Sequence, residues 1–234
     1  MKKSIHLALA LAATAACSVA SAGVITFESF APGVYSQGAT FGSGYDILTV
    51  QGTPSEFLGG AILQGSDPLS CEIAACPVGN ASRYYVGLAD TGLNFMRSDM
   101  SILLSSLDFG FVLPVASLVV GPVGQLRVTG TLSNGTTTSV EKDFSAQNAG
   151  GKFAFSRWDI GGTFAQTRFT QVAFNACLYL DNFCSFDSDD TRGQAQFAID
   201  NIAFVPEPAS LALVGVSLFG MFAAGRRSKS RKSV

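Results

Sequence analysis

QLRVTGTLSNGTTTSV, at residues 125–140, carries the clearest local signal of structure in the chain. Leu126, Val128 and Leu132 alternate with polar residues, a period-two pattern that is typical of a strand with one buried face. Asn134-Gly135 then leads into a run of threonines, and Asn-Gly between two such runs predicts a β-hairpin with a type I′ turn. We therefore expect an antiparallel hairpin with its apolar side toward a core and its arginine and threonine side toward water.

The flanking sequence continues this strand-like character in both directions. β-branched and aromatic runs bounded by Gly, Pro, Ser and Asn predict further strands at 24–28, 45–50, 83–88, 102–113, 153–158, 170–176 and 196–204. Between them, residues 52–82 read as a long decorated loop region with short strands, and no window shows an amphipathic helical period. About nine or ten short strands without helices predict an all-β fold, an antiparallel β-sandwich, with a jelly roll as its specific form.

The N-terminus has the three parts of a secretory signal peptide. Lys2 and Lys3 precede the apolar run 5–16, and Ala20-Ser21-Ala22 is a small-residue cleavage site. We expect a signal helix within residues 1–22 and cleavage after Ala22. The signal then takes with it the only histidine of the chain, His6, together with Cys17.

The C-terminus combines an apolar run with a basic end. Residues 209–224 carry no charge, and as a helix they would span about 24 Å, which is short for a hydrocarbon core of about 30 Å. Arg226 and Arg227 begin a basic tail at 226–232, and by snorkelling they would help the helix to fit. The positive-inside rule places this tail in the cytoplasm and residue 205 outside. We expect a transmembrane helix at 209–224.

The triplet Pro206-Glu207-Pro208 directly precedes this helix. In order and position, the triplet, the apolar helix and the terminal Arg-Arg pair resemble the PEP-CTERM sorting signal of Gram-negative bacteria. The resemblance implies that an exosortase, a membrane cysteine protease, processes the chain near the triplet on the outer face of the inner membrane. It covers residues 206–234 and not the body; a plain stop-transfer anchor is the alternative.

The body between the two signals, residues 23–205, fits one domain. It keeps 8 of the 15 basic residues and 16 of the 17 acidic residues, so its net charge is −8. A body this acidic argues against nucleic acid, whose phosphates need a basic surface. It suits an exported protein that binds cations or neutral glycans.

The body retains four cysteines, and it passes through an oxidising compartment. Three pairings are possible, and the short spacings favour two local disulfides, Cys71–Cys76 and Cys177–Cys184. A zinc site is the alternative, but the body has no histidine and lacks the Cys-x2-Cys spacing.

Enzymatic chemistry has few candidates in this body. Without histidine, a Ser or Cys nucleophile lacks its usual base. Paired carboxylates could still hydrolyse a glycoside, drawn from the aspartates and from Glu28, Glu56, Glu72 and Glu141, but no local motif selects a pair. We expect no enzymatic activity.

Two sets of acidic residues are candidate calcium ligands. Asp187 and Asp189 lie in an alternating acidic loop that resembles the start of a calcium loop, although Arg192 stands where the turn needs glycine. A solvated acidic loop is the alternative reading. The ends of the body, with Glu28 and Asp200, loosely resemble carbohydrate-binding-type jelly rolls, and this resemblance implies a structural calcium where first and last strands meet. We expect no other cofactor.

The body is rich in aromatic residues, most of which belong in a core. Trp158 and the pair Tyr84-Tyr85 are candidates for a sugar-stacking platform, with core packing as the alternative. The sequence thus predicts an exported, non-enzymatic surface or matrix protein with a structural or interaction role in exopolysaccharide or biofilm. Its expected partners are signal peptidase, exosortase, transiently the inner membrane, and exopolysaccharide. The alternatives are a carbohydrate-binding module and a secreted glycoside hydrolase.

Overall fold

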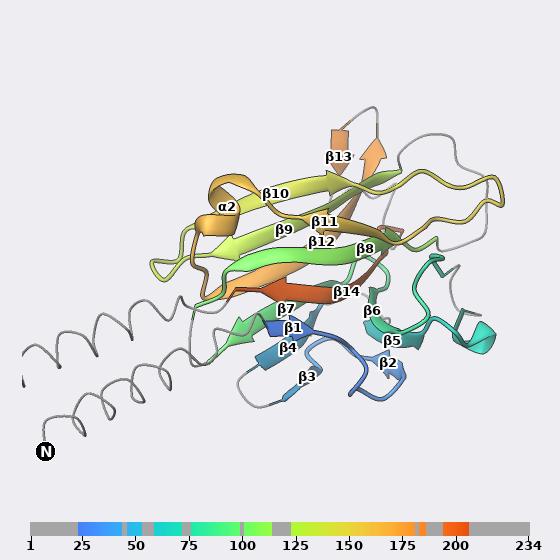
Figure 1. The fold of residues 1–234 in the computed structure, drawn as a ribbon, viewed down its shortest axis with the longest axis horizontal. Helices are drawn as coiled ribbons and strands as arrows, with labels where there is room; N and C mark the ends of the chain where they lie inside the picture. The colour runs from blue at the N-terminus through green and yellow to red at the C-terminus, as the bar shows by residue number, and fades with distance from the viewer. Residues whose placement is uncertain are drawn as a thin grey trace, which may run out of the picture. The chain divides into compact units, whose positions relative to one another are not determined.

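A computed structural model describes most of the body, as residues 23–43, 46–52, 59–71, 76–98, 101–113, 123–180, 183–185 and 194–205. Residues 23–204 form one compact unit. The described strands form two seven-stranded sheets, and every pairing between the named strands is antiparallel (Figure 1). The predicted antiparallel β-sandwich is therefore confirmed.

The first sheet has the order β11-β8-β14-β6-β5-β2, and β1 pairs with β14 beside this path. Its strands are β1 (Gly23–Ile25), β2 (Gly33–Tyr35), β5 (Gly60–Gln64), β6 (Arg83–Gly87), β8 (Leu104–Phe111), β11 (Ser156–Asp159) and β14 (Phe197–Phe204). The first strand of the body thus lies beside its last, with Gly23 opposite Phe204.

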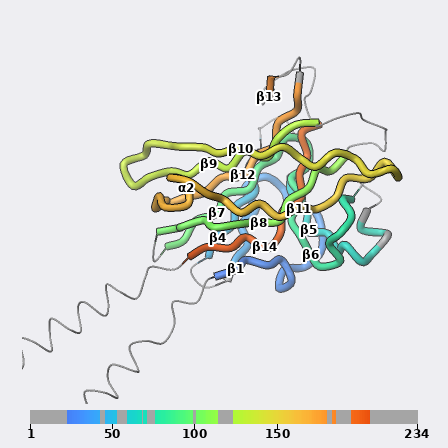
Figure 2. The backbone as a smooth tube through the Cα atoms, turned by 45° about the horizontal axis from the view of Figure 1, so that its top comes forward, coloured from blue at the N-terminus to red at the C-terminus, as the bar shows by residue number. Residues whose placement is uncertain are grey.

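The second sheet has the order β10-β9-β12-β7-β4-β3, and β13 pairs with β12 at one end. Its strands are β3 (Thr40–Ser43), β4 (Asp46–Gln51), β7 (Gly92–Arg97), β9 (Gly124–Thr131), β10 (Thr137–Asp143), β12 (Gln171–Leu180) and β13 (Phe183–Ser185). Among the described residues, the helices are the short 3-10 turn η1 (Pro68–Cys71) and the single-turn α2 (Gly162–Gln166). The tube view shows β13 projecting from the rest of the body (Figure 2).

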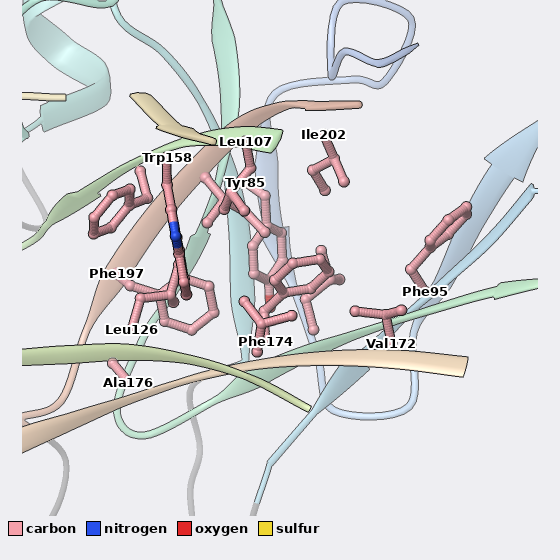
Figure 3. Close-up of a cluster of buried hydrophobic side chains, with 14 of the residues drawn as sticks. Tyr85, Phe95, Leu107, Leu126, Trp158, Val172, Phe174, Ala176, Phe197 and Ile202 are labelled. Carbon is pink, nitrogen blue, oxygen red and sulfur yellow. The ribbon is translucent and has the colours of Figure 1, made fainter. Parts of the chain in front are cut away.

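The main core fills the space between the two sheets. Figure 3 shows Trp158, Leu107 and Ile202 of the first sheet facing Leu126 and Phe174 of the second. Along β9, buried and half-buried residues alternate without interruption, as the sequence pattern predicted. Burial of each such apolar side chain contributes about 1.5–3 kcal/mol. The Tyr85 hydroxyl crosses this core and donates to the carbonyl of Gly92 at 3.0 Å, which links the two sheets.

A second, smaller core covers the outward face of the first sheet. Tyr84, Val86 and Ala198 belong to it, and Phe155 packs against them with its ring 5.1 Å from that of Tyr84. The cover consists of two short segments held together by backbone bonds, from Val78 N–H to the Phe153 carbonyl and from Phe155 N–H to the Val78 carbonyl. The first sheet therefore has no solvated face at this position.

The hairpin predicted at 125–140 is present as β9 and β10, but its turn type differs from the prediction. The Gly135 N–H donates to the Leu132 carbonyl, and Gly135 has a positive φ of 84° while Asn134 does not. The Asn134 side chain accepts hydrogen bonds from the backbone N–H and the hydroxyl of Thr136. This local bonding favours a turn with one left-handed residue, so the type I′ prediction, which needs two, is wrong.

Most other predicted strands are present with boundaries shifted by a few residues. The sequence pattern did not predict β7, a central strand, or the short strands β2, β3 and β13. Leu93 and Phe95 of β7 are fully buried and alternate with Asn94 and Met96, so the signal was present but short. None of the helices among the described residues is long and apolar enough to cross a membrane. The predicted signal helix and the helix at 209–224 lie outside those residues.

Candidate functional site

Asp200 is a buried carboxylate on the outward face of the first sheet. It lies on β14 between Ile199 and a bulge, and only 1% of its surface is exposed. One carboxylate oxygen accepts hydrogen bonds from the Asn80 amide and the Ser82 hydroxyl, both at 2.8 Å. The other accepts the backbone N–H of Asn201 at 2.8 Å. Asp200 therefore ties the covering segment around Asn80 to the centre of the sheet.

The bulge next to Asp200 brings a second carboxylate close. Asn201 has a positive φ of 49°, and the β14–β8 register shifts between Asp200 and Ala203. The Asn201 amide donates to Asp108, which is the cross-strand partner of Asp200. Arg157 lies 3.8 Å from the other oxygen of Asp108. Bulges often re-aim a side chain at a functional position, so this cluster was a candidate for chemistry.

The electrostatics of the cluster follow from its burial. Burial raises the pKa of Asp200 above its usual range, and the hydrogen bonds from Asn80, Ser82 and Asn201 oppose this rise. The negative charge of Asp108 adds to it. Two adjacent carboxylates, one with a raised pKa, are the signature expected of a glycoside hydrolase. Here Asp200, the carboxylate with the raised pKa, is buried, and its oxygens already accept three hydrogen bonds. A glycosidic oxygen therefore has no route to it.

Within the described part of the chain, the predicted carboxylates are not gathered into one site. Glu28 accepts the backbone N–H of Arg83 at 2.9 Å, and Glu141 pairs with Arg127 at 2.6 Å. Asp200 bonds to the residue before Arg83, so the two predicted calcium ligands hold the same short segment. Within the described ranges, no group of three or more His, Cys, Asp or Glu side chains could hold a metal ion.

The remaining predicted carboxylates are Asp187, Asp189, Glu56 and Glu72, which lie outside the described residues. The calcium sites therefore remain predictions.

The predicted sugar-stacking residues all point into cores. Tyr84 and Tyr85 have no exposed surface, and Trp158 is 8% exposed. Tyr85 and Trp158 belong to the main core and Tyr84 to the smaller one. The stacking prediction is wrong for these residues, because their faces are already occupied by neighbouring side chains. Burial also raises the pKa of Tyr84 to about 12, and its hydroxyl has no partner among the described residues.

One of the two predicted disulfides is confirmed. Cys177 and Cys184 are bonded, and they join β12 to β13. Cys76 is also disulfide-bonded. The side chain of Cys71 lies outside those described, so the Cys71–Cys76 pairing remains a prediction. The confirmed bridge fixes the projecting hairpin, whose Phe183 is 79% exposed.

The outward face of the second sheet differs from that of the first, because it carries polar residues from edge to edge. One row of cross-strand partners crosses six strands, and we call it the cross-sheet row; it contains Thr40, Thr49, Asn94, Ala173, Thr129 and Ser139. Strands are about 4.8 Å apart, so the row is about 24 Å long. Its hydroxyls and its amide present hydrogen-bond donors and acceptors along this length.

Asn94 is the exceptional member of the cross-sheet row. It is only 8% exposed, although its strand neighbours Leu93 and Phe95 point to the opposite face. Its cross-strand partners are Thr49 and Ala173, and Gly92 is the next residue on the same face. The carbonyl oxygen of its amide is buried and has no hydrogen-bond partner within the described part of the chain. Such an acceptor costs about 1–3 kcal/mol when nothing satisfies it.

Charged groups lie on the β9–β10 side of this face, and each has a bonded partner. Arg127 pairs with Glu141, and Asp143 accepts hydrogen bonds from Tyr179 at 2.6 Å and Gln125 at 2.9 Å. The Tyr179 bond is the main cause that lowers the pKa of Asp143, and it raises the pKa of Tyr179 to about 12. The face therefore offers mainly neutral hydrogen-bonding groups.

A small cavity of about 170 Å³ opens near β1 and β4. Thr26, Ser29 and Asp46 line it together with Ile25, Phe30 and Leu48. Asp46 is ion-paired with Arg97 at 3.0 Å, and Arg97 in turn lies over the ring of Phe204. Asp46, the charged residue of the cavity, is therefore already paired with the arginine that packs on the end of β14.

Sequence reasoning missed Asn80, Ser82 and Asn94, which the sheet register and the covering segment position. Asn80 and Ser82 lie in a stretch that carries only turn signals, and no local pattern links them to Asp200. For Asn94, the alternation of Leu93, Asn94 and Phe95 was the available signal. It predicts the outward direction of the side chain but not its burial.

Comparison with known proteins identifies one sequence motif. Residues 204–228 match the PEP-CTERM protein-sorting motif. No curated protein matches the chain.

Several solved structures are similar to the chain at low identity. Arabinose-bound MgGH51 α-L-arabinofuranosidase is 12% identical with a TM-score of 0.42, and the match covers 81% of this chain and 27% of the arabinofuranosidase. CtCBM11 is 15% identical with a TM-score of 0.24, and the match covers 82% of this chain and 99% of CtCBM11. The chain spans about a quarter of the arabinofuranosidase that it matches.

Proposed function

From the PEP-CTERM protein-sorting motif at residues 204–228, we propose that this chain is a non-enzymatic interaction protein of a Gram-negative cell surface or extracellular matrix. The motif implies an exported protein that exosortase processes and that is sorted to the cell surface through the membrane. The body would supply a structural or binding role within exopolysaccharide or biofilm. The proposal needs no cofactor.

The motif itself is the observation that carries this proposal. Its first residue, Phe204, is also the last residue of β14, where it is 4% exposed and packs against Phe95 with ring centroids 5.7 Å apart. The sorting signal therefore begins where the β-sandwich ends, with Val205 before the triplet. Signal peptidase and, transiently, the inner membrane complete the proposed route.

Two features support a non-enzymatic body. Cleavage after Ala22 leaves the body without histidine. In the carboxylate pair Asp108–Asp200, the residue with the raised pKa, Asp200, is buried away from solvent. We also propose that the sandwich is a jelly roll, because β1 lies beside β14 and the chain passes repeatedly between the sheets.

Export with the host exosortase tests the proposal. Glu207→Ala, or replacement of Pro206-Glu207-Pro208, should leave the protein exported but unprocessed in the inner membrane, because the extended triplet would present Glu207 to the protease. Intact mass and fractionation into membrane, surface and culture matrix are the readouts. Glu141→Ala is the matched control, since it makes the same change outside the motif and should be processed normally. Normal mature mass and normal location of the Glu207→Ala protein would contradict the proposal.

Replacement of the basic residues at 226–232 separates the two parts of the signal. Their charges cost about 2.5–3.5 kcal/mol each at the centre of a bilayer, so they should halt export. Without them, the helix should slip or be released, whereas the triplet variants should stay anchored. If the triplet variants and the basic-residue variant behaved identically, the tail would act only as a membrane anchor.

A carbohydrate-binding module is the second candidate function. The observation that favours it is the cross-sheet row, which lies on a face that no named strand covers, on an acidic body. A secreted glycoside hydrolase is a weaker alternative, because Asp200, the member of the Asp108–Asp200 pair with the raised pKa, is buried.

A further inference from the structure

The outward face of the second sheet carries a feature that folding alone does not require. Antiparallel sheets commonly have one solvated face, and there polar residues need no further partner than water. Asn94 departs from this pattern because less than 10% of its surface is exposed. The carbonyl oxygen of its amide also has no hydrogen-bond partner among the described residues. A buried unsatisfied acceptor at the centre of a polar face is a position where a ligand would gain a hydrogen bond.

Two small residues and one further amide flank the Asn94 amide, and the Asn175 amide lies over Gly92. Gly92 has no side chain, and Ala173 contributes one methyl group. Asn175 and Gln171 follow on the same face of β12, on either side of Ala173. The site therefore combines three amides with methyl-sized apolar surface, and the threonine and serine hydroxyls of the cross-sheet row extend it in both directions.

We propose that the cross-sheet row, centred on Asn94, is a binding site for one linear chain of a neutral polysaccharide. The inference rests on the proposed function and names the ligand class and the face that would bind it. Sugar hydroxyls would donate to the Asn94 carbonyl oxygen and exchange hydrogen bonds with Thr49 and Thr129. The apolar C–H face of a sugar would lie over Ala173.

Charge and shape favour this occupant over others. The body carries a net charge of −8, and Arg127 on the same face is already paired with Glu141, so an anionic polymer would meet repulsion without a free cation along the row. Protein interfaces have cores enriched in aromatic side chains, and the row has none. A row about 24 Å long and one side chain wide fits an extended polymer better than a compact ligand.

Affinity gel electrophoresis of the mature protein, purified after export, tests the proposal. The probes are the neutral polymers hydroxyethyl cellulose, dextran and galactomannan, with anionic alginate and a polymer-free gel alongside. We expect at least one neutral polymer to retard the wild type. Asn94→Ala and Thr129→Val should each weaken that binding by roughly tenfold, the loss of one or two hydrogen bonds.

Thr138→Val is the matched control. Thr138 lies on β10 beside Ser139 but points to the opposite side, so the same chemical change should leave the affinity unchanged. Urea unfolding of each variant establishes that the fold is intact, and Thr129→Val, which nearly conserves volume, keeps the test valid if Asn94→Ala is unstable.

Several outcomes would overturn the proposal. These are no retardation by any neutral polymer, retardation by alginate alone, or equal binding by wild type and both row variants. Self-association that needs Asn94 and no polymer would assign the face to a second copy of the chain. If the polysaccharide proposal fails, the protein is still processed and still sorted to the expected cell fraction. If the proposed function fails, the mature mass or the cell fraction of the protein shows it directly.

Discussion

Asp200 and Asn94 occupy comparable places, each on the outward face of a central strand, yet their surroundings are opposite. Asp200 lies under a covering segment and accepts hydrogen bonds from Asn80, Ser82 and the backbone of Asn201. Asn94 lies on a face that no named strand of the sandwich covers, and its amide oxygen has no partner within the described residues. A polar group buried by the protein's own cover is satisfied by that cover. A polar group recessed on an open face is left for something outside the fold.

The two residues also differ in what burial costs each polar group. A carboxylate under a lid needs several donors, since desolvation of a charge is costly. A neutral amide tolerates an unsatisfied oxygen at a cost of about 1–3 kcal/mol. The two positions should therefore respond in opposite ways to loss of their polar groups.

Asp200→Ala should have the largest effect on stability. The change leaves the donors of Asn80, Ser82 and Asn201 without their acceptor in a buried layer and detaches the covering segment. We expect the free energy of unfolding to fall by about 3 kcal/mol, measured by urea denaturation of the mature protein.

Asp159→Ala is the control for this change. The Asp159 side chain is 80% exposed and pairs with Arg157, so its loss should cost at most about 0.5 kcal/mol. A similar small effect at Asp200 would show that the cover is held by apolar contacts alone.

The pH dependence of stability should reveal the same burial. Because the pKa of Asp200 is raised in the folded protein, the native state holds an extra proton between the ordinary carboxyl pKa and the raised value. Stability from this group is therefore greater at the acid end of that window and falls as pH rises through it. Asp200→Asn, which cannot titrate, should lack this component.

Urea midpoints from about pH 4 to about pH 8 measure the effect as the difference between wild type and variant. Asp108 and Arg157, the charged residues beside Asp200, are present in both proteins, so the difference reports on Asp200. A difference that does not change with pH, or that grows in favour of the wild type as pH rises, would contradict the raised pKa.

The sequence predicted the fold where the signal was local. Alternation in 125–140 and the absence of helical periods were sufficient for an antiparallel sandwich. The turn type was not predictable from Asn134-Gly135 alone, because the Asn134 side chain bonds to Thr136 and changes the backbone conformation. Aromatic residues such as Trp158 were assigned both to the core and to a site, and only packing could decide between these readings.

The candidate site was less predictable because it depends on long-range register. Thr49, Asn94, Ala173 and Thr129 come from four strands that are far apart in the sequence, and nothing local places them in one row. The side-chain donors to Asp200, Asn80 and Ser82, lie more than a hundred residues away from it. Outward direction can be inferred from alternation, but cover or exposure depends on which other segments fold over the face.

Tyr179→Phe tests an exposed hydrogen bond as an intermediate case. The Tyr179 hydroxyl donates to Asp143 and lowers its pKa, so the pair stabilises the fold above the ordinary carboxyl pKa and loses this contribution as pH falls through the lowered value. Its loss should cost about 0.5 kcal/mol near neutral pH, because water screens both groups. Urea unfolding at neutral and acid pH checks the size and the sign; an effect that grows toward acid pH would contradict this account.

Asn94→Val should have the smallest effect and complete the comparison. Valine removes an unsatisfied acceptor and favours a strand, so the free energy of unfolding should stay the same or rise by up to about 1 kcal/mol. Asn80→Val is the matched change under the cover, where loss of the amide that donates to Asp200 should cost about 2 kcal/mol. A loss of more than about 1 kcal/mol at Asn94 would mean that its amide already has a partner in solution and serves the fold. Unchanged or higher stability together with weaker polysaccharide binding would show that the protein keeps a slightly unfavourable amide at this position for its ligand.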